Sequence, residues 1–203
     1  MAIADYAQLQ DSLKAWLWDR EDLAGRVPDF VSMCEADLND ELRVAQMEGS
    51  AVVTLTNGSG PLPADYLQWR RVMTQDSPVR VLEYADPAWA EDHFQGSPAS
   101  LSWFFTIVWT TIQTYPTSIP NLTLSYYKKI PALSSSNVTN WLLARKPQVY
   151  LYGSLVHAAP FLDDDDRLQT YGALRKVAIE SLTGSDRLAR YGKSVQRPPG
   201  ATP

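Results

Sequence analysis

The sequence has one cysteine, Cys34, and two histidines, His93 and His157, among its 203 residues. A single cysteine excludes the framework of intramolecular disulfides that stabilises small secreted domains. The two histidines are far apart, and neither belongs to a short metal-binding spacing such as His-Glu-x-x-His. Cys34 has no basic neighbour in the sequence that would lower its pKa, so we expect a small buried apolar residue and not a nucleophile.

The chain also lacks long apolar runs and any surplus of positive charge. No run reaches the roughly 18 apolar residues that a membrane-spanning helix needs, and Met1–Tyr6 has neither the basic start nor the apolar core of a signal peptide. The net charge is -5, whereas binding of nucleic acid through its phosphates needs clustered Lys and Arg. We therefore predict a protein that makes no membrane contact and stays in the cytoplasm where it is made.

Two short motifs invite a chemical interpretation but fit a structural one better. Asp163–Asp166 lacks the alternating ligand spacing of a calcium loop, and carboxylates suit the positive end of a helix dipole. Asn57–Gly60 lacks the Gly-Lys-Ser/Thr ending of a phosphate-binding loop and is typical of a hairpin turn. Because no set of nucleophile, base and stabilising group is visible, we predict no catalytic residues, no metal site, no cofactor and no enzymatic activity.

Helical periodicity is present near both ends of the chain. Residues 5–18 place apolar side chains at three- and four-residue spacing, and Asp5 with Gln8 fits a capping box. Pro28 suits the first turn of a second helix, which we expect to end near Gly49. Residues 148–162 are apolar on nearly every side. A last helix over about 164–190, with an interruption at Gly184, has a stripe of Leu168, Tyr171, Leu174, Val177, Ala178 and Leu182.

The helix predicted over 148–162 has to be covered on all its faces, and a chain of this size can hardly cover it alone. We therefore predict that neighbouring subunits complete its burial. The residues predicted at this subunit interface are Trp141, Tyr150, Tyr152, Leu155, His157 and Phe161.

Between the helices the pattern becomes that of strands. From Ser50 to about Lys128, β-branched and aromatic runs alternate with turns, and frequent prolines favour short strands and edge positions. The predicted fold is α+β: a helical bundle of two N-terminal and two C-terminal helices with an inserted antiparallel β domain and an extended C-terminal tail. The predicted boundaries are 1–49 and 129–190 for the bundle, 50–128 for the β insertion and 191–203 for the tail.

The order of several segments resembles the adaptor, or head-completion, proteins of tailed bacteriophages. The most specific block is Tyr126–Leu133 followed by Asn140–Leu143, Tyr150–Gly153 and Ala158–Leu162. Further blocks in the same order are Leu13–Leu17, Pro61–Arg71, Leu82–Tyr84 and Arg187–Gly192. The resemblance covers nearly the whole chain, and matched blocks in the right order are more specific than any single motif. The chain departs from the family pattern around Trp103–Ile119.

The resemblance implies a structural role in the virion, at the head-tail junction, after synthesis in the host cytoplasm. Such adaptors form a ring, usually of twelve copies, that seals the packaged head under the portal protein and provides the platform for tail attachment. The implied partners are the portal and the nozzle or tail-completion proteins, and DNA passes through the ring without sequence-specific binding. The residues then expected to dock on the portal are Arg187, Arg190, Tyr191, Lys193 and Arg197.

A second class of function stays open. The seven tryptophans would suit a β module that binds a glycan by stacking, but cores and subunit contacts use tryptophan equally. Glycan binding predicts that the strand region binds sugar, whereas an adaptor's apolar helix predicts assembly.

Overall fold

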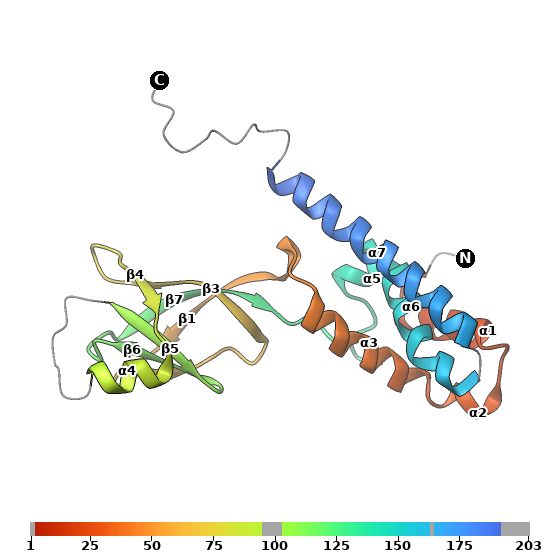
Figure 1. The fold of residues 1–203 in the computed structure, drawn as a ribbon, viewed down its shortest axis with the longest axis horizontal. Coiled ribbons are helices and arrows are strands. Elements are labelled where there is room, and N and C mark those ends of the chain that lie inside the picture. Colours follow the sequence, from red (N-terminus) through yellow and green to blue (C-terminus); the bar gives the residue numbers. More distant parts are fainter. Residues whose placement is uncertain (1–2, 95–102, 163–164, 192–203) are drawn as a thin grey trace, which may run out of the picture. The chain divides into compact units, whose positions relative to one another are not determined.

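The computed structural model describes residues 3–94, 103–162 and 165–191 of the chain. The chain divides into two compact units (Figure 1). The helical unit is drawn from both ends of the chain, up to Gln46 and from Ile130 onward, and the sheet unit runs from Met47 to Lys129. The predicted extended tail, 191–203, lies outside the described residues beyond Tyr191.

In the helical unit, α6 is the central helix, and α1, α3 and α7 pack around it. The α-helices of this unit are α1 (Tyr6–Trp16), α2 (Glu21–Ala24), α3 (Val27–Glu41), α5 (Trp141–Arg145), α6 (Pro147–Ala158) and α7 (Asp165–Tyr191). Two 3-10 turns are also present, η1 (Ala45–Met47) before the sheet unit and η2 (Ala159–Leu162) after α6.

Local sequence explains where several of these helices begin. The Asp5 side chain caps α1 by accepting a hydrogen bond from the backbone N–H of Gln8, at 2.8 Å. Pro28 lies in the first turn of α3, where its missing N–H costs nothing. Asn140 caps α5 by accepting hydrogen bonds from the backbone N–H groups of Leu142 and Leu143. The predicted cap at Asp5 and the predicted start of the second helix are therefore present, while the Gln8 side chain accepts from the backbone N–H of Ala4 and not from that of Asp5.

The contact between α3 and α6 is unusually close, and a glycine permits it. A Cβ atom at Gly153 would lie much closer to the Cys34 sulfur than van der Waals contact between carbon and sulfur allows. Both residues are buried, so neither helix can retreat without opening a void in the core.

The sheet unit has seven strands in the order β1-β7-β3-β4-β5-β6-β2. Their bounds are β1 (Glu48–Thr54), β2 (Ser59–Pro61), β3 (Tyr66–Thr74), β4 (Val81–Tyr84), β5 (Phe104–Val108), β6 (Thr111–Tyr115) and β7 (Asn121–Lys128). All neighbouring strands are antiparallel except β4 and β5, which are parallel. The helix α4 (Pro87–Phe94) lies in the connection between these two strands, as a parallel pair requires.

The sheet curls into a nearly closed, barrel-like form around an apolar core. Leu122, Leu124 and Tyr126 alternate inward along β7 and join the buried core of the unit. The two end strands approach each other: Gly60 in β2 lies against the backbone oxygen of Thr54 in β1, where a Cβ would lie only 2.5 Å away. Glycine at this position therefore lets the two ends of the sheet meet.

The predicted fold class is wrong in its architecture. The described residues form seven α-helices, where the prediction has a bundle of four. The strand region is a seven-stranded, barrel-like sheet with a parallel pair and a helix of its own, where the prediction has an antiparallel insertion. The cause is length: α2 and α5 have four and five residues, too few for helical periodicity to show.

Two predicted boundaries also differ from the structure. The second helix ends at Glu41, well before Gly49, because Glu48–Thr54 pairs with β7 as a strand. The last helix runs without interruption through Gly184, since Leu182 and Asp186 on either side are both buried in the helical unit. Burial of these neighbours outweighs the intrinsic cost of a helical glycine, which is about 1 kcal/mol.

Candidate functional site

The polar side chains of the described residues serve mainly to join segments of the fold. Within ranges 3–94, 103–162 and 165–191, no group of three or more His, Cys, Asp or Glu side chains could hold a metal ion. Burial raises the pKa of the Cys34 thiol to about 12, which keeps it protonated and unreactive. The His93 ring stacks on Trp89, with ring centroids 4.3 Å apart. None of the described helices is long and apolar enough to span a bilayer.

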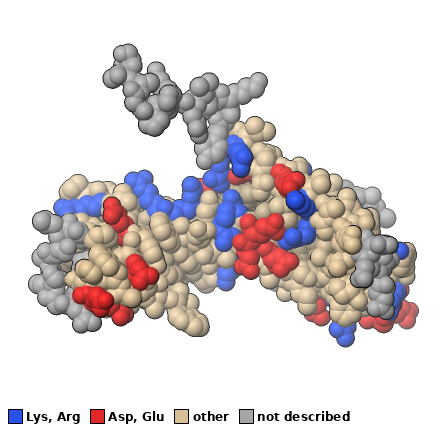
Figure 2. Space-filling model, in the orientation of Figure 1, with Lys and Arg blue, Asp and Glu red and all other residues tan. Residues whose placement is uncertain are grey.

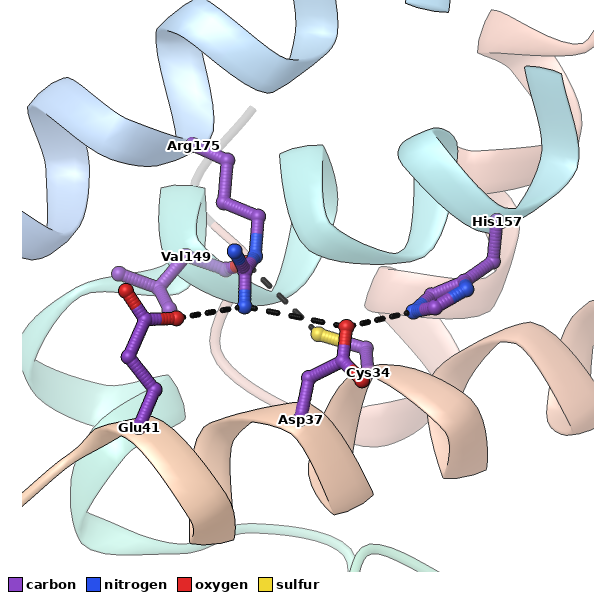
Figure 3. A network of polar contacts seen from close by, with 6 residues as sticks. All are labelled: Cys34, Asp37, Glu41, Val149, His157 and Arg175. Atoms are coloured by element: carbon purple, nitrogen blue, oxygen red, sulfur yellow. Dashed lines mark hydrogen bonds and ion pairs between the residues drawn. The ribbon is translucent and has the colours of Figure 1, made fainter.

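A charged network fastens three helices of the helical unit together (Figure 3). The guanidinium of Arg175 on α7 donates to Glu41 on α3 at 2.8 Å and lies 3.9 Å from Asp37. His157 on α6 has its Nε2 atom 3.1 Å from the same Asp37 carboxylate. The network thus links α3 to both α6 and α7 on the outside of the close contact at Cys34.

A second polar cluster is buried and holds the chain segment that returns from the sheet unit. The Glu35 carboxylate on α3 accepts hydrogen bonds from the backbone N–H of Leu133, at 2.8 Å, and from the Tyr150 hydroxyl, at 3.2 Å. Asn140 donates to the Tyr150 hydroxyl at 2.7 Å and to the backbone oxygen of Pro131 at 2.8 Å. Burial raises the pKa of Glu35 above its ordinary value of 4.5, although its two hydrogen bonds favour the charged form.

The same segment is tied to α3 at its beginning. The backbone N–H of Ile130 donates to the Asn39 side chain at 2.8 Å. With Glu35 and Asn39 four residues apart on one face of α3, this helix provides two fixed points for residues 130–133. Within the helical unit, the first residues after β7 are therefore held on α3 by side-chain hydrogen bonds.

The C-terminal half of α7 is anchored by a buried carboxylate. Asp186 is only 6% exposed and accepts hydrogen bonds from the backbone N–H of Ala45, at 3.1 Å, and from Arg190, at 2.9 Å. This contact joins the end of the long helix to the segment that leads out of α3. Residues 165–191 therefore belong to the helical unit along most of their length.

The six residues predicted at a subunit interface lie in different environments. Tyr150 and Leu155 are fully buried by this chain's own helices. Trp141, Tyr152 and His157 are half-buried. Phe161 is 45% exposed, with the Arg26 guanidinium 5.6 Å from its ring centroid. Of the six, the four that are not fully buried have solvent-accessible surface that a partner could contact.

The residues predicted to dock on the portal lie at or beyond the end of α7. Arg187 is exposed, and Arg190 pairs with Asp186. Tyr191 is the last described residue, and Lys193 and Arg197 lie outside the described residues. Arg190 thus already has an internal partner, whereas Arg187 presents its side chain to solvent.

The sheet unit carries one conspicuous exposed aromatic residue. Trp109 occupies the turn between β5 and β6, is 94% exposed and has a positive φ of 56°. A shallow groove of about 380 Å³ beside it is lined by Pro61, Leu62, Pro63, Ala64, Tyr66, Thr110 and Lys129. An exposed tryptophan in a left-handed conformation has a backbone cost and no folding benefit, which points to a surface contact.

Sequence reasoning missed Glu35, Asn140, Arg175 and Asp186. Glu35, Arg175 and Asp186 have partners far along the chain, so no local pattern identifies their contacts, whereas Asn140 is a local N-cap of α5. The only available signal is a carboxylate or amide inside an apolar stripe, as Glu35 is next to Cys34 on α3.

Comparison with known families gives one match that covers both units. Residues 4–199 match the model of a protein family described as SU10 adaptor protein. The match confirms the resemblance to bacteriophage head-to-tail adaptors. No curated protein matches the chain.

Proposed function

Because the chain belongs to the SU10 adaptor protein family, a family of phage structural adaptors, we propose that it forms a ring between portal and tail. The observation that carries this proposal is the extent of the family match, which spans the helical unit and the sheet unit. The proposed ring has twelve copies, seals the packaged head and passes DNA without sequence-specific binding. A net charge of -5 supports the last point, because an acidic lumen repels phosphate groups.

In this proposal the two units have different partners. The end of α7 and the residues beyond it dock on the portal, with Arg187, Tyr191, Lys193 and Arg197 as the contacts. The sheet unit meets the nozzle or tail-completion proteins, and Trp109 at its β5–β6 turn supplies the exposed aromatic anchor. The protein acts mechanically and not as an enzyme, which agrees with the unreactive state of Cys34.

The first test is co-purification with the portal protein of the same genome, followed by negative-stain electron microscopy. The truncated variant should end at Tyr191, because a cut at Gly184 would also remove the Asp186 anchor. We expect the full chain to form a second ring stacked on the portal, and the truncated chain to lose it.

A full-length Arg187→Glu variant serves as the companion to the truncation. It should weaken portal binding while leaving the Ala45–Asp186 anchor intact. Full portal binding by the truncated chain would disprove docking through the C-terminal residues. If the full chain, the truncated chain and the Arg187 variant all fail to form a complex with an intact portal, the adaptor function itself is overturned.

A further inference from the structure

One exposed face of α3 carries a carboxylate near each end and no positive charge. The helix contains no Lys or Arg, and two of its five carboxylate residues, Asp29 and Asp40, lie on this face. Asp29, Met33, Ala36 and Asp40 recur on it at three- and four-residue spacing, and all four are exposed. Figure 2 shows Asp and Glu atoms gathered on the helical unit over the C-terminal half of α3. We call Asp29, Met33, Ala36 and Asp40 the acidic face.

A second exposed face, on α7, has the opposite character. Leu174, Val177, Ser181, Gly184 and Leu188 follow the same spacing, carry no charge and are all exposed, and we call them the α7 stripe. Val177 and Leu188 are 63% and 70% exposed. Two cations lie at the rim: Arg145 donates to Ser185 at 3.0 Å, and Lys146 donates to Ser181 at 2.9 Å.

We propose that these two faces bind each other between neighbouring copies of this chain, so that the acidic face of one copy packs on the α7 stripe of the next. Charge complementarity selects this occupant. Asp29 and Asp40 are opposite in charge to Arg145 and Lys146 at the rim of the stripe, and Met33 supplies an apolar side chain for it.

The alternative pairings of the same surfaces are unfavourable. Two acidic faces in contact would place Asp29 and Asp40 of each copy against carboxylates of the other. Two α7 stripes in contact would bring Arg145 and Lys146 of both copies together. Like charges facing each other cost affinity, so the contact joins two different faces. Contacts between two different faces propagate from copy to copy and close into a ring when the rotation permits.

The charged network gives this contact a fixed geometry. Both α3 and α7 pack on α6, and Arg175 ties α7 directly to Glu41 of α3. The angle between the two binding faces is therefore set inside one helical unit. This inference rests on the proposed ring and adds to it which surfaces form the subunit contact.

The first experiment is disulfide cross-linking of the full-length protein. A double variant carries Ala36→Cys on the acidic face and Val177→Cys on the α7 stripe. The native Cys34 stays in place because it is buried and unreactive. Mild oxidation should give a ladder of covalent multimers on a non-reducing gel. The matched control joins Ala36→Cys with Val52→Cys, an exposed valine of the sheet unit, and should give no ladder. If the Ala36→Cys/Val177→Cys protein gives covalent multimers no larger than those of the control, the inference is overturned.

The second experiment blocks one face at a time. Asp40→Arg should disable the acidic face and Val177→Asp the α7 stripe, each lowering self-association at least about tenfold in analytical ultracentrifugation. A mixture of the two variants keeps one intact face of each kind and should form a one-to-one complex that grows no further. Absence of that complex, with both variants folded, contradicts the pairing.

Failure of this inference is distinguishable from failure of the proposed function. If both blocked variants still assemble a normal ring on the portal, the subunit contact lies elsewhere and the adaptor function stands. If the cross-linked ladder forms but no variant or wild-type protein binds the portal, the contact stands and the adaptor function fails.

Discussion

The hydroxyl of Tyr150 donates a hydrogen bond to the carboxylate of Glu35, 3.2 Å away, in the interior of the helical unit. The two residues come from α6 and α3, and the same carboxylate holds the backbone N–H of Leu133. A single buried acceptor therefore joins two helices and the segment that follows the sheet unit. Its protonation state affects the stability of all three.

The Glu35 carboxyl should make stability depend on pH in a definite direction. Burial raises its pKa in the folded state above the ordinary 4.5, so the folded protein binds the proton more tightly than the unfolded chain. The stability that this group contributes is fully present below pH 4.5 and is lost as the pH rises through the folded-state pKa. Glu35→Gln keeps an acceptor oxygen and removes the ionisation. The variant should therefore gain stability relative to wild type between pH 4.5 and pH 7.5 in urea titrations.

The control for this prediction is Glu35→Leu. Leucine leaves the Leu133 N–H and the Tyr150 hydroxyl without their acceptor, which costs about 1–3 kcal/mol for each buried group. If the Gln and Leu variants have the same free energy of unfolding, the hydrogen bonds to residue 35 do not stabilise the fold.

Gly153→Ala should be among the most destabilising small substitutions in α6. The added methyl group would collide with the Cys34 sulfur at the close contact between α3 and α6, and overpacking of this kind costs about 1–3 kcal/mol. The matched control is Gly172→Ala in α7, where a Cβ meets nothing within 4 Å. That change should raise helix propensity and stabilise the protein by up to about 1 kcal/mol. Equal effects of the two substitutions on the free energy of unfolding would disprove the close contact.

Arg175→Met should weaken the link between α3 and α7. The ion pairs with Glu41 and Asp37 are partly solvated, so their loss should lower the free energy of unfolding by about 1 kcal/mol or less. The loss should be larger at low ionic strength, because salt screens exposed pairs. Urea denaturation in about 20 mM and in about 1 M sodium chloride measures the difference. An effect that is independent of salt would mean that packing of the Arg175 side chain, not its charge, holds the helices together.

Features that are determined by residues close together in the sequence could be predicted from local patterns. The Asp5–Gln8 cap is present, and so is the turn at Asn57 and Gly58, which both have positive φ. The inward alternation of Leu122, Leu124 and Tyr126 also follows from sequence period alone.

Features that depend on distant partners could not be predicted in the same way. The last helix shows apolar residues around much of its circumference. Tyr171 and Leu182 are buried, whereas Leu174 and Val177 from the same predicted stripe are exposed. Only the positions of α1, α3 and α6 decide which side of α7 faces the core. The parallel pairing of β4 with β5 likewise depends on the path of the chain through α4, which a four-residue strand does not encode.

Trp109→Gly should separate stability from binding. Trp109 is 94% exposed and has a positive φ, so its ring contributes little to folding, and glycine adopts this backbone conformation without strain. We expect the melting temperature to stay unchanged or rise slightly. In the proposed adaptor, the same change removes the aromatic anchor for the tail proteins and should weaken their co-purification at least about tenfold. The matched control is Val52→Gly, which truncates another exposed side chain of the sheet unit and should leave tail-protein binding intact. Unchanged binding by the Trp109 variant would place the tail contact on another surface of the sheet unit.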